Sequence, residues 1–327
     1  MDHEALAAKI TKSYQWVDGI KQEMGRVLVG QSSLVERLII GLLTNGHILL
    51  EGVPGLAKTL AIKSLAGCLN SDFARLQFTP DLLPADLLGT MVYNQESGDF
   101  SAKLGPIFSN LVLADEINRA PAKVQSALLE AMQERQVTIG SKSYPLPDPF
   151  LVLATQNPID QEGTYTLPEA QLDRFLVKVN IDYPNKQEEL TILERMATSA
   201  EIAGTKQVVD IDKVIASRAL VNDIYIDPSI REYIVELVHN TRNPGNVDPE
   251  LVPLIRSGAS PRATINLALA SKAHAFSQGR AFVTPQDVKD LATDVLRHRI
   301  LPSYEAEAED ISTDLIVERI LNKTIVP

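Results

Sequence analysis

Cysteine is almost absent from this chain of 327 residues, which contains only Cys68. A single cysteine excludes an internal disulfide and fits a reducing compartment. The five histidines are scattered along the sequence and form no cluster with metal-ligand spacing. No apolar run approaches the roughly 20 residues that a membrane helix needs. The first residues also lack the charged-then-apolar pattern of a secretory signal, so we expect a cytoplasmic protein without a membrane segment.

Positive charge is also in short supply. The chain has 31 lysines and arginines against 42 aspartates and glutamates, which gives a net charge of −11. Proteins dedicated to nucleic acid usually carry a basic excess, so this balance argues against such a role, although a local basic patch could override it. The hydrophobic fraction of 45% and the charged fraction of 22% are ordinary for a globular protein, and the length predicts about two domains.

Short apolar runs alternate with helical patterns through the first half of the chain. Strands that alternate with helices form a parallel sheet covered on both faces. Residues 1–184 are therefore predicted to form an α/β core with a five-stranded parallel sheet flanked by helices. The strand-like runs are His47–Leu50, Ala74–Phe78, Leu111–Ala114, Phe150–Ala154 and Phe175–Ile181, and the helical patterns include Ser32–Asn45, Thr59–Leu69 and Ala122–Glu134.

The character of the sequence changes after Pro184, beyond which no strong strand-like run appears. Helix starts are well marked there, because a capping side chain repeatedly precedes a proline at the first helical position. These pairs are Asp227-Pro228, Ser260-Pro261 and Thr284-Pro285. Asn185 also begins a capping-box pattern. Residues 185–327 are therefore predicted to form an all-helical second domain.

A glycine-rich turn, GVPGLAKT from Gly52 to Thr59, joins a predicted strand to a predicted helix. This is the context of a phosphate-binding loop, in which backbone N–H groups and the positive end of the helix capture an anion. Lys58 is expected to pair with the β and γ phosphates, and the Thr59 hydroxyl to ligate Mg²⁺. Ala57 stands where the usual pattern has glycine, and its methyl fits if that residue is helical and its Cβ points away from the nucleotide. The alternative is a chance glycine turn.

The run LVLADE, Leu111 to Glu116, is typical of a buried parallel strand that ends in two carboxylates. Ligands of open parallel sheets lie beyond the carboxyl ends of the strands. Asp115 is expected to hold the water shell of the magnesium ion, and Glu116 to polarise the attacking water, because hydrolysis depends on a positioned nucleophile and stabilised charge. The alternative is a solvated acidic pair. With the upstream loop, the pair predicts an ATPase that uses ATP and Mg²⁺.

Three further polar residues are suited to a γ-phosphate. Asn157 ends the run FLVLATQN, where an amide can hydrogen-bond both the water and the phosphate; the alternative is a simple Asn-Pro turn. Arg174 precedes the last predicted strand, and its planar fork suits charge developing on oxygen; the alternative is an ion pair with Asp173 or Glu169. Arg262 lies in the first turn of a predicted helix, where the dipole does not favour a cation, so a phosphate or a local carboxylate is expected to hold it.

Together, the segments GVPGLAKT, LVLADEINRAP, ATQNP, LPEAQLDRF, GASPRA and LRHRI resemble the MoxR family of AAA+ ATPases, over about residues 29–300. The loop is generic, whereas LADEINRAP combined with LPEAQLDRF is specific. The resemblance implies an AAA+ core and a helical lid with a nucleotide in the cleft between them. It also implies that Asn157 is sensor 1, Arg174 the arginine finger and Arg262 sensor 2. Alanine at position 57 resembles the family's own version of the loop.

The same resemblance implies a set of nucleotide contacts. Val29-Gly30-Gln31 resembles the segment that lines the adenine pocket in AAA+ proteins, and the loop and the helix start supply the rest. The implied contacts are Gly30, Gln31, Gly52, Pro54, Gly55, Leu56, Ala57, Lys58, Thr59 and Leu60.

Two decorations resemble those of related ATPases. Residues 89–108 are similar to the insert in the second helix that magnesium chelatase subunits and replicative helicases share. Residues 136–150 are typical of a hairpin, with Gly140 at its turn. Each segment is equally compatible with a surface loop that has no partner.

The resemblance further implies a homo-oligomeric ring, expected to be a hexamer, that drives chaperone-like maturation or activation of a partner complex. It implies a partner with a von Willebrand factor A domain. A metal-chelatase-type motor subunit and a nucleic-acid-dependent, helicase-like motor stay open as alternatives. A DNA-gripping pore should be basic, but residues 133–150 carry two basic and two acidic side chains, and residues 89–108 carry one basic and two acidic ones. The charges therefore favour a protein partner.

Overall fold

The computed structural model describes residues 3–53, 55–96, 98–157, 164–198 and 204–327. The chain divides into two compact units, which we call the sheet unit and the lid unit. The sheet unit comprises Trp16–Arg174 and Val179–Ile215, and the lid unit comprises Met1–Gln15, Phe175–Lys178 and Ala216–Pro327. Both are discontinuous in sequence. The predicted domain boundary at residue 184 divides the chain into two continuous segments. The grouping into discontinuous units does not test that boundary, which stays a prediction.

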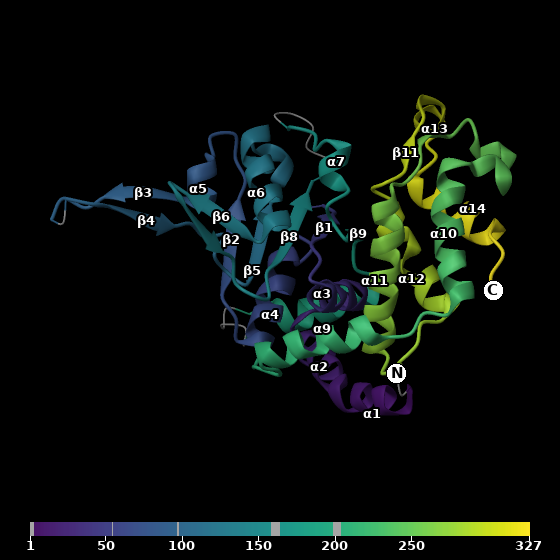
Figure 1. Cartoon of the computed structure of the whole chain (residues 1–327), viewed down its shortest axis with the longest axis horizontal. Helices are drawn as coiled ribbons and strands as arrows, with labels where there is room; N and C mark the ends of the chain where they lie inside the picture. The colour runs from purple at the N-terminus through teal and green to yellow at the C-terminus, as the bar shows by residue number, and fades with distance from the viewer. Residues whose placement is uncertain (1–2, 54, 97, 158–163, 199–203) are drawn as a thin grey trace. The chain divides into compact units, whose positions relative to one another are not determined.

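A five-stranded sheet in the order β2-β5-β8-β1-β9 confirms the predicted fold class (Figure 1). Its strands are β1 (Ile48–Glu51), β2 (Phe73–Gln77), β5 (Leu111–Asp115), β8 (Leu151–Gln156) and β9 (Val177–Asn180). The pairs β2–β5, β5–β8 and β1–β8 are parallel. The three inner strands are buried almost throughout, as parallel strands are when both faces are covered.

Helices cover the sheet on both faces. The crossover through α4 leads from β1 to β2, in one direction across the sheet, whereas the crossover through α6 leads from β5 to β8 in the other. Right-handed crossovers in opposite directions place their helices on opposite faces, in agreement with Figure 1. The helices of the sheet unit are α2 (Gln15–Val27), α3 (Ser32–Thr44), α4 (Lys58–Leu69), α5 (Pro84–Leu88), η1 (Ile117–Arg119), α6 (Ala122–Glu134), α7 (Glu169–Leu172) and α8 (Lys186–Met196), and α9 (Ile211–Asp223) begins in the sheet unit and ends in the lid unit.

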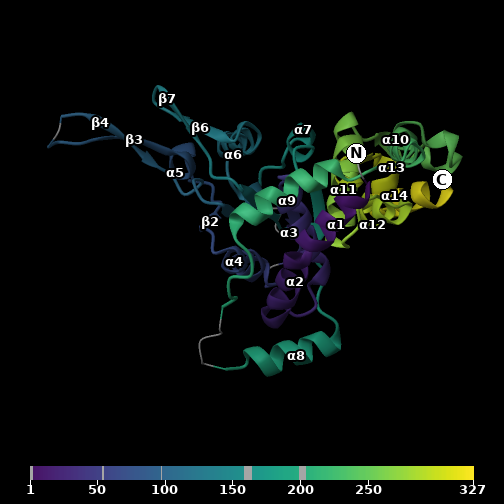
Figure 2. The ribbon, with the colours of Figure 1, turned by 60° about the horizontal axis from the view of Figure 1, so that its bottom comes forward.

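Two antiparallel hairpins extend from the sheet unit. The segment predicted as an insert forms β3 (Gly89–Tyr93) and β4 (Phe100–Leu104), which point away from the sheet in both views (Figures 1 and 2). The second hairpin pairs β6 (Gln136–Ile139) with β7 (Lys142–Pro145), and Gly140 at its turn has a φ of 65°. A positive φ of this kind is readily adopted by glycine, which accounts for the residue at that turn.

The lid unit consists mainly of helices, whose starts are capped as predicted. The side chain of Asp227 caps α10, that of Ser260 caps α11 and that of Thr284 caps α12. A departure from the all-helical prediction is the antiparallel pair β10–β11, which is too short to leave a pattern in the sequence. The elements are α1 (His3–Ser13), α10 (Pro228–Arg242), η2 (Pro244–Asn246), η3 (Pro249–Leu251), β10 (Ile255–Ser257), α11 (Pro261–Ser277), α12 (Pro285–Leu296), β11 (Leu301–Pro302), α13 (Tyr304–Ala308) and α14 (Thr313–Lys323). Across the described segments, none of the helices is long and apolar enough to span a membrane.

Candidate functional site

A pocket of about 440 Å³ lies in the sheet unit where the glycine-rich loop meets the carboxyl ends of the strands. We call it the phosphate pocket. It brings together the loop, the start of α4, the acidic pair that follows β5 and the amide that follows β8. Its lining residues are Gly55, Leu56, Ala57, Lys58, Thr59, Leu60, Arg75, Gln77, Asp115, Glu116, Thr155 and Asn157.

The loop owes its shape to two glycines and an unusual alanine. A Cβ on Gly52 would stand 2.9 Å from the carbonyl oxygen of Ile181, whereas Gly55 has a φ of 88° and open space where a Cβ would be. Ala57 lies just before α4 with φ 56° and ψ 22°. From the sequence, a helical backbone was required at this residue, and that expectation is wrong. This left-handed backbone costs an alanine about 1 kcal/mol, and the usual glycine avoids that cost. Pro54, a predicted contact, lies outside the described residues.

Lys58 is the first residue of α4 and donates a hydrogen bond from Nζ to the carbonyl of Gly52. Burial lowers the pKa of its ammonium group, while the negative charges of Asp115, Glu116 and Glu51 oppose that shift. The lysine head therefore lies among carboxylates in a partly desolvated setting. Such a cation interacts strongly with a multiply charged anion because the local dielectric is low.

Asp115 is held on both carboxylate oxygens. Thr155 donates from Oγ1 to Asp115 Oδ1 at 2.8 Å, and Arg75 donates from Nη2 to Asp115 Oδ2 at 2.6 Å. The same Thr155 hydroxyl accepts the backbone N–H of Glu116 at 2.9 Å. One hydroxyl of β8 thus fixes both the side chain of the first acidic residue and the backbone of the second. Supporting contacts of this kind orient the ligands of a metal ion.

Glu116 occupies a backbone conformation that is rare outside glycine, with φ 57° and ψ 52°. Its Oε2 accepts a hydrogen bond from Gln77 Nε2 at 3.0 Å and pairs with Arg119 Nε at 3.0 Å. Left-handed residues other than glycine cost free energy and are concentrated at functional sites. The turn after β5 therefore aims the Glu116 carboxylate, and two donors hold it there.

Three residues of the pocket received no role from the sequence: Arg75, Gln77 and Thr155. Arg75 and Gln77 alternate along β2, and the register places Gln77 beside Asp115. The available signal was two polar side chains spaced by two in a predicted strand. The spacing indicates a role in the pocket only when β2 is known to lie next to β5. The order of strands in a sheet belongs to the tertiary structure, so the sequence did not give this role.

Among the described residues, five predicted ones do not line the phosphate pocket: Gly30, Gln31, Gly52, Arg174 and Arg262. Arg174 donates from Nη1 to the carbonyl of Leu129 in α6 at 3.0 Å, and Arg262 is exposed near the start of α11. Gly30 has a φ of 71°, and Gln31 precedes α3. Their roles stay predictions.

The oxygen donors of the pocket fit the group that the sequence implies. Mg²⁺ takes oxygen ligands, usually one or two from the protein, and leaves the other positions to phosphates and water. Thr59 offers a hydroxyl at the start of α4 and Asp115 a carboxylate at the end of β5, and both line the same pocket. A hydroxyl and a carboxylate beside a phosphate-binding loop are the donor set that a nucleotide-bound magnesium ion requires.

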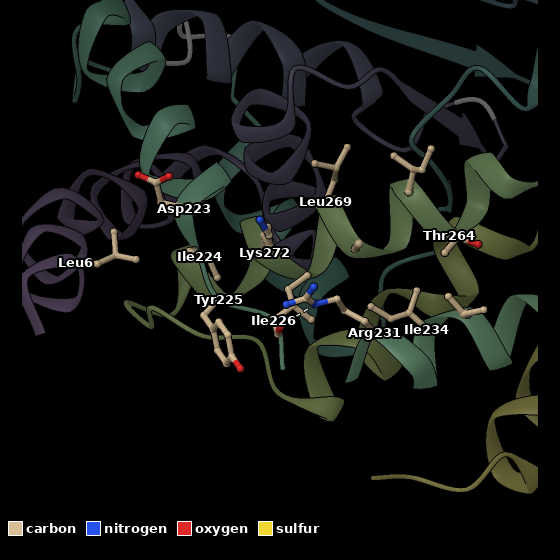
Figure 3. Close-up of a pocket in the computed structure, with 13 residues that line it drawn as sticks. Leu6, Asp223, Ile224, Tyr225, Ile226, Arg231, Ile234, Thr264, Leu269 and Lys272 are labelled. Atoms are coloured by element: carbon tan, nitrogen blue, oxygen red, sulfur yellow. Dashed lines mark hydrogen bonds between the residues drawn. The ribbon is translucent and has the colours of Figure 1, made fainter. Parts of the chain in front are cut away.

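A second pocket of about 680 Å³ lies in the lid unit, between α10, α11, the end of α9 and Leu6 (Figure 3). Its lining is mainly apolar, and its two cations serve the fold: Arg231 donates to the carbonyl of Ile226, and Lys272 to that of Asn222. The lining residues include no glycine-rich loop and no pair of adjacent carboxylates. The pocket of the lid unit is therefore unsuited to a nucleoside triphosphate, and the phosphate pocket is the candidate site.

Comparisons with known proteins identify the family of this chain. Residues 47–177 match the family described as the ATPase family associated with various cellular activities (AAA), and residues 252–320 match the AAA lid domain. The chain is 46% identical to Chaperone MoxR1 of Mycobacterium tuberculosis, over 99% of this chain and 85% of that protein. It is 44% identical to the protein YeaC of Bacillus subtilis, over 94% of this chain and 93% of that protein.

A solved structure also matches at high identity. A crystal structure of a protein from Cytophaga hutchinsonii, 51% identical, superposes with a TM-score of 0.91 and covers 99% of this chain and 98% of its own. The fold, the phosphate pocket and the relatives agree with the motifs quoted from the sequence. The chain belongs to the MoxR family of AAA ATPases.

Proposed function

We propose that this ATPase binds ATP in the phosphate pocket and hydrolyses it to ADP and phosphate with the help of Mg²⁺. The observation that supports the proposal best is the convergence of Lys58, Thr59, Asp115 and Glu116 on one pocket beside a glycine-rich loop. They come from two segments of the chain, with Lys58 and Asp115 57 residues apart in sequence, but lie at one edge of the sheet. A chance glycine turn or a solvated acidic pair would require no such convergence.

The loop and α4 supply the binding half of the site. The backbone N–H groups at the start of α4 and its positive end favour the phosphates, and Lys58 adds a mobile cation that can leave the Gly52 carbonyl for a phosphate oxygen. Thr59 and Asp115 would hold the magnesium ion. When bound, the ion supplies positive charge to the phosphate oxygens.

The strand ends supply the hydrolytic half. Glu116 would accept a hydrogen bond from the attacking water and so orient it, while Gln77 and Arg119 keep the carboxylate in place. Asn157 lines the pocket after β8 and would hydrogen-bond the water or the γ-phosphate. Phosphoryl transfer depends mainly on positioning and on charge stabilisation, and these residues serve both needs.

The test is phosphate release by the purified protein, measured together with the binding of a fluorescent ATP analogue. Excess EDTA should abolish phosphate release, and added magnesium should restore it. Release that continues at the same rate in EDTA would contradict the role of the ion. An absence of nucleotide binding by the folded protein would contradict the site itself.

We further propose that the active form is a homo-oligomeric ring, most simply a hexamer, in which Arg174 stabilises the γ-phosphate bound to a neighbouring subunit and Arg262 approaches the nucleotide from the lid. Five N–H donors are available on a guanidinium, so the bond to the Leu129 carbonyl leaves Arg174 further donors. Light scattering after gel filtration, with ATP and magnesium, should give a mass well above that of one chain. A monomer at every concentration that supports turnover would contradict the ring.

We also propose that the ring remodels a protein partner, in keeping with the relative called a chaperone. The expected partner is a protein with a von Willebrand factor A domain or a complex that it helps to mature. The β3–β4 hairpin offers the contact, because its large apolar side chains are exposed and the rings of Tyr93 and Phe100 pack 5.2 Å apart. Exposed aromatic side chains are common anchors of protein interfaces.

A pull-down with a tagged, non-hydrolysing protein tests this role. Replacing both Tyr93 and Phe100 by serine should abolish capture of the partner, whereas Tyr304→Ser, a change of an exposed tyrosine in the lid unit, should not. DNA is the matched negative probe. Tight, salt-sensitive DNA binding, or ATPase activity stimulated by DNA, would instead support a nucleic-acid motor.

A further inference from the structure

The guanidinium of Arg75 contacts two side chains of the phosphate pocket, and neither half of the proposed mechanism makes use of it. Its Nη2 and Nε donate to Oδ2 of Asp115 at 2.6 and 3.2 Å. Nη2 also donates to Oε1 of Gln77 at 3.1 Å. Arg75 itself lines the pocket. One planar group thus joins a proposed magnesium ligand to a residue that holds Glu116.

The alternation of side chains along β2 brings these groups together. Arg75 and Gln77 are two residues apart and project from the same face of the strand, while Leu76 between them is buried on the other face. The register places Gln77 beside Asp115 on the neighbouring strand β5. Arg75 therefore reaches forward along its own strand and across to the next one, toward the carboxyl ends where the pocket lies.

The arginine also decides which way the amide of Gln77 points. A glutamine amide accepts hydrogen bonds through its oxygen and donates them through its nitrogen, whereas a guanidinium only donates. The oxygen Oε1 therefore faces Arg75, and the nitrogen Nε2 faces Glu116, to whose Oε2 it donates at 3.0 Å. Without Arg75, only the hydrogen bond to Glu116 would hold this amide, and the side chain of Gln77 would gain rotational freedom.

The exposure of Arg75 favours an orienting role over a role in stability. Its side chain is 50% exposed, while that of Asp115 is 16% exposed. Ion pairs of exposed side chains add little to stability because water and salt compete for both charges. A planar guanidinium nevertheless fixes the direction of its partners, since its donors are preorganised in one fork. Asp115 is held on its other oxygen by Thr155, so Arg75 completes the orientation of that carboxylate.

We propose that Arg75 is a positioning residue that fixes both acidic side chains of the phosphate pocket, Asp115 directly and Glu116 through the amide of Gln77. The inference rests on the proposed roles of Asp115 in magnesium binding and of Glu116 in hydrolysis. Because one guanidinium serves both carboxylates, the arrangement that holds the ion and the arrangement that orients the water are established together.

Three possible roles of Arg75 predict different measurements. A direct contact with a phosphate predicts that loss of Arg75 weakens nucleotide binding even without magnesium. A purely structural role predicts a large fall in stability. The positioning role predicts two separate losses, a higher magnesium requirement through Asp115 and a lower turnover at saturating magnesium and ATP through Gln77.

The experiment compares Arg75→Met, Gln77→Leu and the double variant by phosphate release at increasing magnesium. Arg75→Met should raise the magnesium concentration for half-maximal turnover about tenfold and lower saturated turnover about 10- to 100-fold, the scale of a misplaced catalytic group. Gln77→Leu should lower saturated turnover by a similar factor with the magnesium requirement unchanged. The double variant should turn over no more slowly than Gln77→Leu, because residues that act through one another are not additive.

Two further measurements do not depend on turnover. The affinity of a fluorescent ATP analogue in EDTA should be the same for Arg75→Met and the wild type, whereas the magnesium dependence of its binding should shift about tenfold. The melting temperature of the nucleotide-free protein should fall by no more than about 2–4 °C. Arg75→Lys should recover part of the magnesium requirement but not the turnover, because an ammonium replaces the charge and lacks the fork that reaches both partners.

Arg26→Met is the matched control. The Arg26 side chain is 52% exposed, and its Nη1 pairs with Glu23 on α2 at 2.8 Å. The change removes a half-exposed arginine ion pair of the sheet unit that does not line the phosphate pocket. The magnesium requirement, the saturated turnover and the affinity for the analogue should all stay at their wild-type values.

The outcomes separate this inference from the proposed function. Normal hydrolysis by Glu116→Gln would contradict the proposed function, and the role of Arg75 would fall with it. If Glu116→Gln is inactive while Arg75→Met keeps both the turnover and the magnesium requirement of the wild type, the inference about Arg75 alone is overturned. It is also overturned if Arg75→Met weakens analogue binding in EDTA as strongly as Lys58→Met does, if it melts far below the wild type, or if its loss of turnover multiplies with that of Gln77→Leu.

Discussion

Lys58 of the sheet unit and Lys272 of the lid unit make the same kind of hydrogen bond. Each is partly buried and donates to a backbone carbonyl, that of Gly52 in the first case and that of Asn222 in the second. Burial lowers the pKa of both ammonium groups. The difference lies in what surrounds them, because Lys58 faces the acidic ends of parallel strands, whereas Lys272 lines an apolar pocket between helices.

The two units also share a threonine–aspartate pair. Thr155 donates to Asp115 at 2.8 Å in the sheet unit, and Thr284 donates to Asp287 at 2.8 Å in the lid unit. The first pair lies at adjacent strand ends and lines the phosphate pocket. The second is part of the capping box of α12, where hydrogen bonds, including those from His274 and Arg280, hold the pKa of the Asp287 carboxyl far below its usual range despite burial.

The position of a side chain in the fold, rather than its residue type or the size of the pocket, thus decides whether it lines the candidate site or stabilises the fold. At a helix start, a threonine and an aspartate three residues apart hydrogen-bond to each other and to the backbone, as Thr284 and Asp287 do at the start of α12. The carboxyl ends of parallel strands instead bring side chains from distant segments to one edge, and Glu116 and Ala57 adopt left-handed backbones there. This difference can be tested by pairs of substitutions, one in the sheet unit and a matched one in the lid unit.

The largest effect is expected for Glu116→Gln, with Asp223→Asn in the lid pocket as its partner. Both changes replace a carboxylate by an amide. Glu116→Gln should lower turnover by about 10²- to 10⁴-fold, the scale of a lost general base, and leave ATP binding intact, because the carboxylate acts on the water. Asp223→Asn should change neither quantity. Phosphate release and nucleotide affinity are measured for both, and normal hydrolysis by Glu116→Gln would remove Glu116 from the mechanism.

The pair Lys58→Met and Lys272→Met compares the two lysines. Lys58→Met should weaken ATP binding by about 10- to 100-fold, since hydrogen bonds to charged groups contribute about 1.5–3 kcal/mol. Lys272→Met should leave ATP affinity unchanged, because its lysine serves the fold of the lid unit. Titration with a fluorescent ATP analogue gives both constants. Equal losses in the two variants would mean that nucleotide binding does not distinguish the two pockets.

The threonine pair addresses the metal. Thr155→Val removes the donor that orients Asp115 and should raise the magnesium concentration for half-maximal turnover by about tenfold, the lower end of the range for lost supporting contacts of metal ligands. Thr284→Val removes a helix cap and should lower the stability of the lid unit by about 1 kcal/mol, with no change in magnesium dependence. Magnesium titrations of phosphate release and thermal melts separate the two. A magnesium shift in Thr284→Val alone would reverse the assignment.

The smallest effect concerns the backbone. Ala57→Gly relieves a left-handed alanine and should stabilise the protein by up to about 1 kcal/mol, reduced by the greater freedom of glycine in the unfolded chain. Asp310→Gly in the lid unit, at a φ of 54°, should gain less because aspartate tolerates this conformation better. Thermal melts should show a rise of about 2–4 °C at most for Ala57→Gly. A clear fall would indicate that the methyl group makes a favourable contact.

Much of the candidate site could be predicted from the sequence because its motifs are continuous in the chain. The loop from Gly52 to Thr59 is one continuous segment between a strand and a helix, and Asp115 with Glu116 ends one apolar run. Their convergence follows from a general property of parallel sheets. Arg75 and Gln77 could not be assigned in the same way, since their role depends on β2 being the neighbour of β5.

The segment Leu296–Ile300 shows the same limit. LRHRI helped to identify the family, but backbone carbonyls 119 to 124 residues away in the chain accept its hydrogen bonds, and carbonyls leave no trace in a sequence. The left-handed conformation of Ala57 was hidden too, because alanine by itself favours a helix. By itself the sequence determined the alternating strands and helices, the capped helix starts, the glycine-rich loop with Lys58 and the acidic pair Asp115–Glu116, which are set by periodicity and short-range hydrogen bonding. Only the tertiary structure decided which strands lie side by side, which side chains orient the two carboxylates, and which lid residues hold the backbone after Arg174, because those contacts join segments that are distant in the chain.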